Sequence, residues 1–106
     1  METPLEVDVT TAAQQVREGA LLLDVREPDE FAICRIAGST EIPMRQVPEH
    51  LAELPQDRLI LTLCHHGRRS LNVAQFLRAN GFTRVSSVSG GIHAWAEEID
   101  PSLARY

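Results

Sequence analysis

The sequence predicts an α/β fold in which a mostly parallel sheet is flanked by helices on both faces. Two apolar runs, residues 20–25 and 59–63, are nearly continuous rather than alternating, as expected for strands buried on both faces. Segments with helical spacing of apolar residues separate the predicted strands, and this alternation favours a parallel sheet. With 106 residues, the chain is expected to form a single domain, residues 1–106.

The first quarter of the chain is expected to supply two strands around one helix. Alternating apolar residues over 5–9 predict a short first strand. A helix should follow, capped by Thr10 or Thr11 and ended by Gly19. The apolar run over 20–25 then predicts the second strand, which is buried.

The middle of the chain should contain two helices and one very short strand. Pro28 suits the first position of a short helix, and the acidic residues beside it suit the positive end of the helix dipole. Residues 36–39 predict a turn, and a strand over 41–43 can only be very short. Apolar residues at i, i+4 and i+7 within 47–54 predict a helix that stops near Pro55.

The second half repeats the strand and helix alternation. Residues 59–63 predict the central buried strand, and an apolar stripe predicts a helix over 70–80. A weaker strand is expected over 84–88, where two serines dilute the apolar pattern. A last amphipathic helix is predicted over 92–99, followed by a short tail, residues 101–106.

Composition excludes several classes of function. The formal net charge of −5 does not indicate a surface for nucleic acid or for an anionic membrane. The sequence has no apolar stretch of the roughly 20 residues that cross a bilayer and no secretory signal pattern. The two cysteines, Cys34 and Cys64, favour a reducing compartment over a disulfide framework. We therefore expect a soluble cytoplasmic protein.

The strand over 59–63 places Cys64 in a turn between a strand and a helix. In a parallel α/β sheet, ligands bind at the carboxyl ends of strands, which is where Cys64 is expected. Ser70 is expected to cap the following helix and to bring its hydroxyl within reach of the sulfur. The residues between them are His65, His66, Gly67, Arg68 and Arg69. Converging amides, a helix N-terminus and guanidinium groups stabilise a thiolate, a persulfide or an oxyanion, so the loop predicts a reactive cysteine that handles anions.

Each loop residue also has a simpler structural explanation. A free cysteine packs as a small hydrophobe, but the polar and glycine residues that follow Cys64 favour a functional role. His65 and His66 are expected to shape the pocket mouth rather than to act as acids or bases. A zinc site on Cys64, His65 and His66 is not expected, because adjacent ligands cannot all face one tetrahedral ion and no CxxC or HxxxH spacing is present. Arg68 is equally compatible with solvated surface charge and with anion recognition.

Outside the loop, two residues remain open between alternative roles. Cys34 is expected to be inert rather than a resolving partner for Cys64. Asp24, the one acid in its apolar run, either marks the end of the strand or holds Arg26 or Arg69 by a charge-assisted bond near the site. His50 and His93 are expected on helix surfaces, and Trp95 is expected in the core.

Several segments together resemble the rhodanese family. They are residues 24–31, 36–43, 64–69, 81–82 and 88–95. On these segments the chain resembles a stand-alone, single-domain rhodanese of a bacterial type with a Cys-His-His-Gly active loop. The resemblance implies a three-layer rhodanese-like fold with a five-stranded sheet, and a cysteine persulfide as the catalytic intermediate.

One dipeptide departs from the usual pattern of the family. Many rhodaneses have Gly-His before the isoleucine of the turn, whereas this chain has Cys34 and Arg35. A small bacterial subgroup that resembles this chain also carries Cys-Arg there, together with an Asp-Pro-Ser…Arg-Tyr tail. The departure therefore leaves the fold assignment intact, but no role can be borrowed from the usual histidine.

The leading functional hypothesis is sulfur transfer. Cys64 should take a sulfane sulfur from thiosulfate or a persulfide donor and pass it to cyanide or to a protein or small thiol. The backbone over 65–70 should hold the outer sulfur, and Arg68 or Arg69 should recognise the anionic donor. No cofactor and no metal are expected.

Two other functional classes remain as alternatives. Phosphatases and arsenate reductases related to rhodanese resemble a Cys-x5-Arg loop, which is one residue longer than the spacing from Cys64 to Arg69. The shorter loop should suit a sulfur atom better than a phosphate. A relay or binding module with little activity toward thiosulfate is the remaining alternative.

Overall fold

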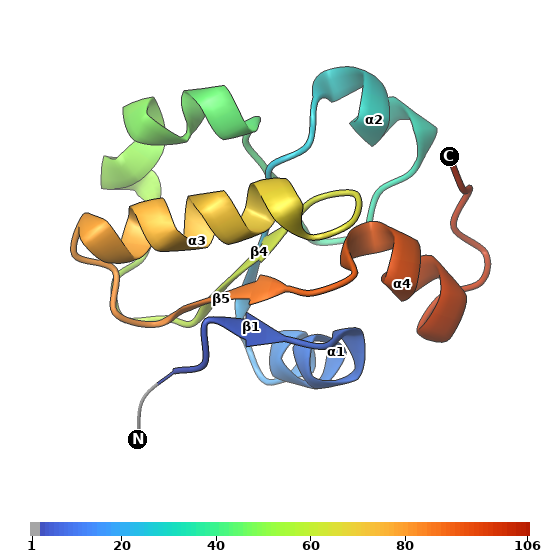
Figure 1. The fold of residues 1–106 in the computed structure, drawn as a ribbon, viewed down its shortest axis with the longest axis horizontal. Helices are drawn as coiled ribbons and strands as arrows, with labels where there is room; N and C mark the ends of the chain where they lie inside the picture. The colour runs from blue at the N-terminus through green and yellow to red at the C-terminus, as the bar shows by residue number, and fades with distance from the viewer. Residues whose placement is uncertain (1–2) are drawn as a thin grey trace.

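The structure is a computed structural model that describes residues 3–106 (Figure 1). Five strands and five helical segments alternate along this part of the chain. In order they are β1 (Glu6–Val7), α1 (Val9–Arg17), β2 (Leu21–Asp24), α2 (Pro28–Ile33), β3 (Thr40–Glu41), the 3₁₀ helix η1 (Met44–Glu53), β4 (Ile60–Leu63), α3 (Arg68–Ala79), β5 (Val85–Val88) and α4 (Gly91–Glu98). No helix in this described part is both long enough and apolar enough to cross a membrane.

The strands form one sheet in the order β1-β5-β4-β2-β3, and every pair is parallel. The predicted α/β class with a five-stranded sheet is therefore confirmed. β4 lies in the middle, with Leu22 of β2 paired to Leu61 and Ser86 of β5 on the other side of Leu61. Because all strands run in one direction, the loops that follow β2, β4 and β5 come together at one edge of the sheet.

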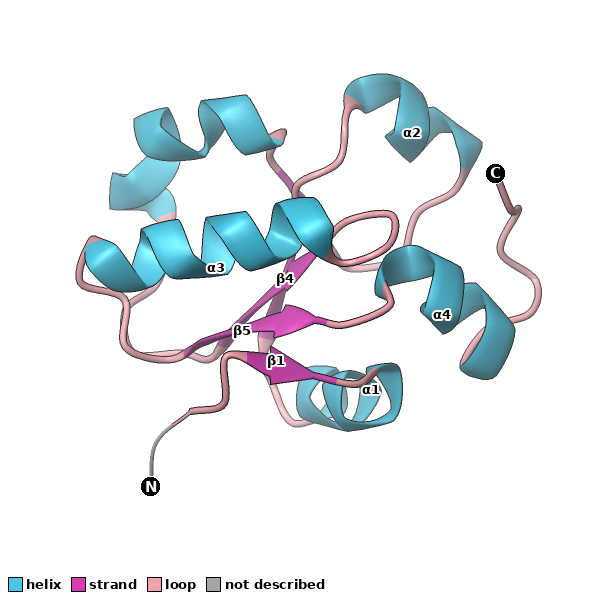
Figure 2. Cartoon of the chain, viewed as in Figure 1, coloured by secondary structure: helices cyan, strands magenta, loops and turns pink. Residues whose placement is uncertain are grey.

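The helices form two layers that cover the two faces of the sheet (Figure 2). Neighbouring residues of one strand point to opposite faces: Leu22 packs in the core beneath α1 and α4, whereas Leu23 packs in the core beneath α3 and η1. Ile60 and Leu61 of β4 divide in the same way. Since both faces are covered, these strands have no polar side, which explains their nearly continuous apolar sequence.

Three predicted boundaries are corrected by the structure. α1 is capped by Asp8, whose side chain accepts a hydrogen bond from the Thr11 amide at 2.8 Å, so neither predicted threonine is the cap. β3 begins one residue earlier than predicted, at Thr40. α3 begins at Arg68 with Gly67 as its cap, which places Ser70 inside the first turn rather than at the cap.

The helix predicted over 47–54 is a 3₁₀ helix. Pro48 lies inside it and has no N–H, so an α-helical bond from this position is impossible. Val47 and Leu54 are nevertheless buried, as the apolar spacing predicts. The spacing thus identified the buried face but not the helix type.

Candidate active site

Cys64 lies directly after β4 and is only 1% exposed. Its Sγ accepts hydrogen bonds from the amides of Gly67 at 3.1 Å and Ser70 at 3.3 Å. The hydroxyl of Ser70 lies 3.4 Å from the same sulfur, within the reach that the sequence predicted. The two amides point at the sulfur, where they are placed to donate to a negative charge.

The first turn of α3 has further donors to offer. The first four amides of a helix have no acceptor inside the helix. In α3 these are the amides of residues 67–70, and those of Gly67 and Ser70 donate to the sulfur of Cys64. Within residues 3–106, no atom accepts a hydrogen bond from the amides of Arg68 or Arg69. Two amides beside Cys64 therefore remain available to an anion.

The loop is fixed by the N-terminus of α4, which packs against its backbone. The amide of Ile92 donates to the carbonyl of Cys64 at 2.8 Å, and the amide of His93 donates to the carbonyl of His65 at 3.1 Å. Gly91 has φ +62°, and a Cβ at this position would overlap the carbonyl oxygens of Cys64 and His65. Only glycine allows this close approach of the two backbones.

Ser70 also connects the loop to β5. Its hydroxyl lies 2.8 Å from the hydroxyl of Ser87, and its carbonyl accepts a hydrogen bond from Thr62 at 2.8 Å. All three side chains are fully buried. Ser87, one of the two serines that weakened the predicted strand, is therefore a buried partner of the site, and it holds the Ser70 hydroxyl near the sulfur.

Asp24 and Arg26 form a buried ion pair next to the site. The Arg26 guanidinium donates to the Asp24 carboxylate at 2.7 Å, and both side chains are fully buried. It also donates to the carbonyl of Cys34 at 2.8 Å and to the hydroxyl of Tyr106 at 2.9 Å. Burial opposes the positive charge of Arg26, but the hydrogen bonds to Asp24 and Tyr106 outweigh the effect of burial and raise the pKa of Arg26. Of the two predicted partners for Asp24, the structure therefore selects Arg26.

Arg69 is held by Glu30 of α2 rather than by Asp24. Two nitrogens of its guanidinium donate to the two oxygens of Glu30 at 2.7 and 2.9 Å. This bidentate pair is the main reason that the pKa of Glu30 falls to about 2, and it raises the pKa of Arg69. Arg68 is exposed, and it makes no ion pair with any residue in 3–106.

The C-terminal tail folds back onto the site. The hydroxyl of Tyr106 donates to Glu30 at 2.7 Å, and its ring stacks on His65 with centroids 3.9 Å apart and planes 11° apart. Burial raises the pKa of Tyr106 to about 12. The tail thus links the ion-paired residues to the loop that carries Cys64.

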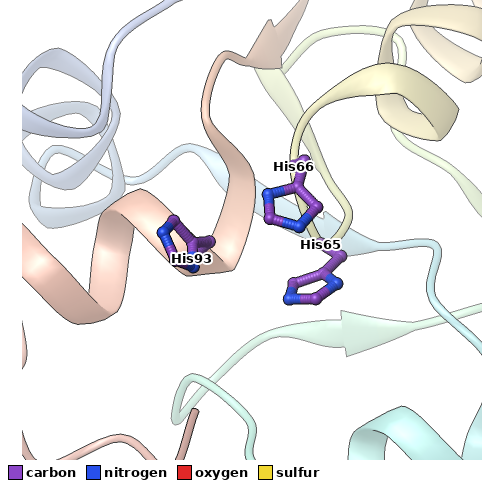
Figure 3. A group of neighbouring side chains, drawn as sticks. All are labelled: His65, His66 and His93. Atoms are coloured by element: carbon purple, nitrogen blue, oxygen red, sulfur yellow. The ribbon is translucent and has the colours of Figure 1, made fainter. Parts of the chain in front are cut away.

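Three histidines meet at the outer side of the loop (Figure 3). The ring of His66 lies 3.9 Å from His65 and 5.1 Å from His93 on α4, centroid to centroid. Burial, and then the neighbouring charge of His66, lower the pKa of His65, which favours its neutral form. His93 was predicted to lie on a helix surface; it does so, but on the surface that faces the loop.

The predicted site residues are thus largely brought together, with additions from distant segments. Cys64, Gly67 and Ser70 share one set of hydrogen bonds, whereas Arg69 turns toward α2. Both cysteines are free, and Cys34 lies next to the Arg26 guanidinium. Residues that the sequence did not assign to the site are Glu30, Ser87, His93 and Tyr106. The acid-rich start of α2 and the aromatic end of the tail are visible in the sequence, but nothing local relates them to Cys64.

Comparisons with known proteins agree with this architecture. Residues 8–98 match the family profile described as Rhodanese-like domain. A protein named sulfurtransferase from Allochromatium vinosum is 35% identical over 93% of this chain and 94% of its own length. The thiosulfate sulfurtransferase GlpE of Pseudomonas aeruginosa is 36% identical over 78% of this chain and 76% of its own length. The crystal structure of a rhodanese-like domain protein from Staphylococcus aureus superposes with a TM-score of 0.81, at 28% identity, over 100% of this chain and 99% of that chain.

Proposed function

The chain belongs to the rhodanese-like family, and on this basis we propose that it is a sulfurtransferase that carries a sulfane sulfur on Cys64. Relatives named sulfurtransferase and thiosulfate sulfurtransferase support transfer of sulfur as the activity. The single observation that carries the assignment of Cys64 is the pair of amides, from Gly67 and Ser70, that point at its Sγ. Both are oriented to donate to a sulfur anion, the form in which a cysteine acts as a nucleophile.

The proposed first step is an attack of the Cys64 thiolate on the sulfane sulfur of thiosulfate. A sulfur–sulfur bond forms between Sγ and that sulfur, while the sulfur–sulfur bond of thiosulfate breaks and sulfite leaves with its electron pair. A persulfide donor reacts in the same way, with its thiolate as the leaving group. The enzyme is left with an anionic persulfide on Cys64.

In the second step, an acceptor such as cyanide or a thiolate attacks the outer sulfur. The bond between the two sulfurs of the persulfide breaks, the outer sulfur leaves with the acceptor, and the Cys64 thiolate is regenerated. Over the full cycle Cys64 returns to its starting state, and the net change is the transfer of one sulfur atom from the donor to the acceptor. Two half-reactions through a covalent intermediate give ping-pong kinetics.

The loop offers separate groups for the two anions of this cycle, which are the persulfide and the sulfur donor. We assign the amides of Arg68 and Arg69 to the outer sulfur of the persulfide, because they lie in the same turn as the donors to Sγ and have no described acceptor. The exposed guanidinium of Arg68 is assigned to the anionic donor. Arg69 is instead a positioning residue, since Glu30 occupies its guanidinium on two sides.

The ion pair of Arg69 with Glu30 argues against a phosphatase activity. A phosphatase loop needs an arginine that is free to hold the oxygens of a phosphate. Arg69 is the nearest candidate by spacing, but its guanidinium is committed to Glu30 at 2.7 and 2.9 Å. We therefore expect no aryl phosphatase activity.

We place the reaction in a reducing compartment such as the cytoplasm. Both cysteines are free, and an oxidising compartment would expose the reactive thiol to competing disulfides. A net charge of −5 gives no support to nucleic acid as a partner. The partners that we propose are a small anionic sulfur donor and a thiol acceptor.

Intact-protein mass spectrometry tests the assignment of Cys64. After incubation with thiosulfate, we expect one added sulfur atom per chain, located on Cys64 by peptide mapping and released by cyanide as thiocyanate. The variant Cys64→Ser should take up none, whereas the matched control Cys34→Ser should load like the unmodified protein. The proposal is wrong if the sulfur resides on Cys34, or if neither thiosulfate nor a persulfide donor loads the protein.

A further inference from the structure

The three histidines beside the active loop place their ring nitrogens close enough to share a ligand. One nitrogen from each of His65, His66 and His93 lies within 4.8 Å of the others (Figure 3). His66 and His93 have half-exposed or exposed side chains, so the cluster is reached from solvent. We propose that these histidines bind one divalent transition metal ion of the Zn²⁺ class, independently of the sulfur transfer.

The backbone already fixes the relative positions of the ligands. The sequence argued against a zinc site on the three adjacent residues 64–66, but here the third ligand comes from α4 instead of from Cys64. His65 and His66 are consecutive in the loop, and the amide of His93 donates to the carbonyl of His65 at 3.1 Å. Gly91 keeps the start of α4 pressed against the same carbonyl, where no other residue fits. The three residues are thereby held together without the metal, so binding requires only movements of side chains.

The required movements are small. Zinc–nitrogen bonds of about 2.0–2.1 Å in a tetrahedral site bring the nitrogens to roughly 3.3 Å from one another. The present separations of up to 4.8 Å close by rotation about the side-chain torsions. His66 is exposed, and no residue in 3–106 bonds to its ring, so its rotation breaks no hydrogen bond in this part of the chain.

A carboxylate stands behind one of the three rings. Nε2 of His93 lies 3.0 Å from Glu97, one turn further along α4, which leaves Nδ1 of His93 for a metal. Carboxylates in this position set the tautomer and orientation of a metal-binding histidine. Tyr106 stacks on His65 and fixes the plane of that ring. The cluster therefore has both ligands and supporting groups.

The ligand set selects the metal. Three neutral imidazoles suit Zn²⁺, Cu²⁺ and Ni²⁺, whereas Mg²⁺ and Ca²⁺ require oxygen ligands. Three protein ligands also leave a fourth tetrahedral position open to water or a small anion. Cys64 is not one of the ligands in this proposal, because its sulfur is buried and points to the amides of Gly67 and Ser70.

Isothermal titration calorimetry of the full chain with Zn²⁺ at neutral pH tests the proposal. We expect one bound ion per chain, and no binding of Mg²⁺ under the same conditions. His66→Ala and His93→Ala should each weaken binding by more than about tenfold, and Glu97→Gln should weaken it by about tenfold, the loss typical of a supporting carboxylate. His50→Ala is the matched control, because His50 lies on η1 with its own carboxylate partner and should keep full affinity.

Two further measurements separate the histidines from the thiols and from misfolding. A thiol-free variant, with Cys34→Ser and Cys64→Ser, should bind Zn²⁺ with unchanged stoichiometry. NMR spectra of the histidine rings should shift for the cluster on addition of Zn²⁺ but not for His50, and far-UV CD should show that each variant is folded. The proposal is overturned if the chain binds no Zn²⁺, if binding survives in both folded histidine variants, or if it disappears in the thiol-free variant.

Discussion

Replacement of Glu30 by glutamine tests the ion pair that orients Arg69. Glu30 accepts hydrogen bonds from Arg69 at 2.7 and 2.9 Å and from Tyr106 at 2.7 Å. The variant Glu30→Gln keeps the size of the side chain and one acceptor oxygen but removes the charge. We expect a less stable protein, and the difference from the unmodified protein should depend on pH.

The lowered pKa of Glu30 sets the size of the expected loss in the free energy of unfolding. Arg69 is the main reason that the pKa of Glu30 falls from 4.5 to about 2 in the folded protein. At 1.36 kcal/mol for each pH unit, the charge stabilises the fold by at most about 3 kcal/mol. Because the side chain keeps 14% of its surface exposed and glutamine retains part of the hydrogen bonding, we expect a loss of about 2 kcal/mol at pH 7. For a domain of this size, that lowers Tm by about 10 °C.

The sign of the pH dependence follows from the lowered pKa. A carboxyl whose pKa is lower in the folded state stabilises the fold fully above the pKa of the unfolded chain, 4.5 here. This stabilisation is lost as the pH falls from 4.5 to about 2, so the difference between the two proteins should shrink over that range.

Urea denaturation of both proteins at a series of pH values measures this difference. Glu53→Gln is the matched control, because Glu53 is an exposed carboxylate on η1, and its replacement should change the free energy of unfolding by less than about 0.5 kcal/mol. A difference between Glu30→Gln and the unmodified protein that stayed constant from pH 7 to pH 2 would refute the charge-based explanation.

Three further substitutions probe other parts of the site. Gly91→Ala should lower the free energy of unfolding by at least about 2 kcal/mol, since the new methyl overlaps two carbonyls; urea denaturation measures this, and an unchanged midpoint would contradict the tight packing of α4 on the loop. Asp24→Ala should cost about 3–5 kcal/mol in the same assay because it leaves the buried Arg26 without its carboxylate, and a loss below 1 kcal/mol would count against the buried pair. Arg68→Ala should raise KM for thiosulfate severalfold with little change in kcat in initial-rate kinetics, whereas an unchanged KM would remove Arg68 from donor recognition.

Local patterns in the sequence account for the architecture. Continuous apolar runs identified β2 and β4 because the helices bury both faces of the sheet. The residues that follow β4 indicated the loop that we propose as the active loop, since Gly67, Arg68 and Ser70 all lie within six positions of Cys64. The predicted helix ends were less accurate, because a cap depends on which nearby side chain reaches the first amides of the helix. For α1 that side chain is Asp8.

The remaining parts of the site depend on contacts between distant segments. Arg69 could have paired with Asp24 as far as the sequence shows, and only the placement of α2 selects Glu30. The same holds for Tyr106, whose hydroxyl reaches Arg26, in the loop after β2, and Glu30 of α2 from the end of the tail. His93 joins the loop because backbone hydrogen bonds dock α4 there, and no spacing in the sequence encodes that contact.

The strand order has a consequence for how the chain assembles during synthesis. β1 pairs only with β5, through backbone bonds such as that from the Ser87 amide to the carbonyl of Leu5 at 2.7 Å. The strands β2, β3 and β4 are neighbours that can pair as soon as residue 63 has left the ribosome. β1 can reach its partner only after β5 has been made, and this pairing closes the longest loop in the described sheet at a cost in chain entropy. Of the five described strands, the one nearest the N-terminus is therefore the last that can join the sheet.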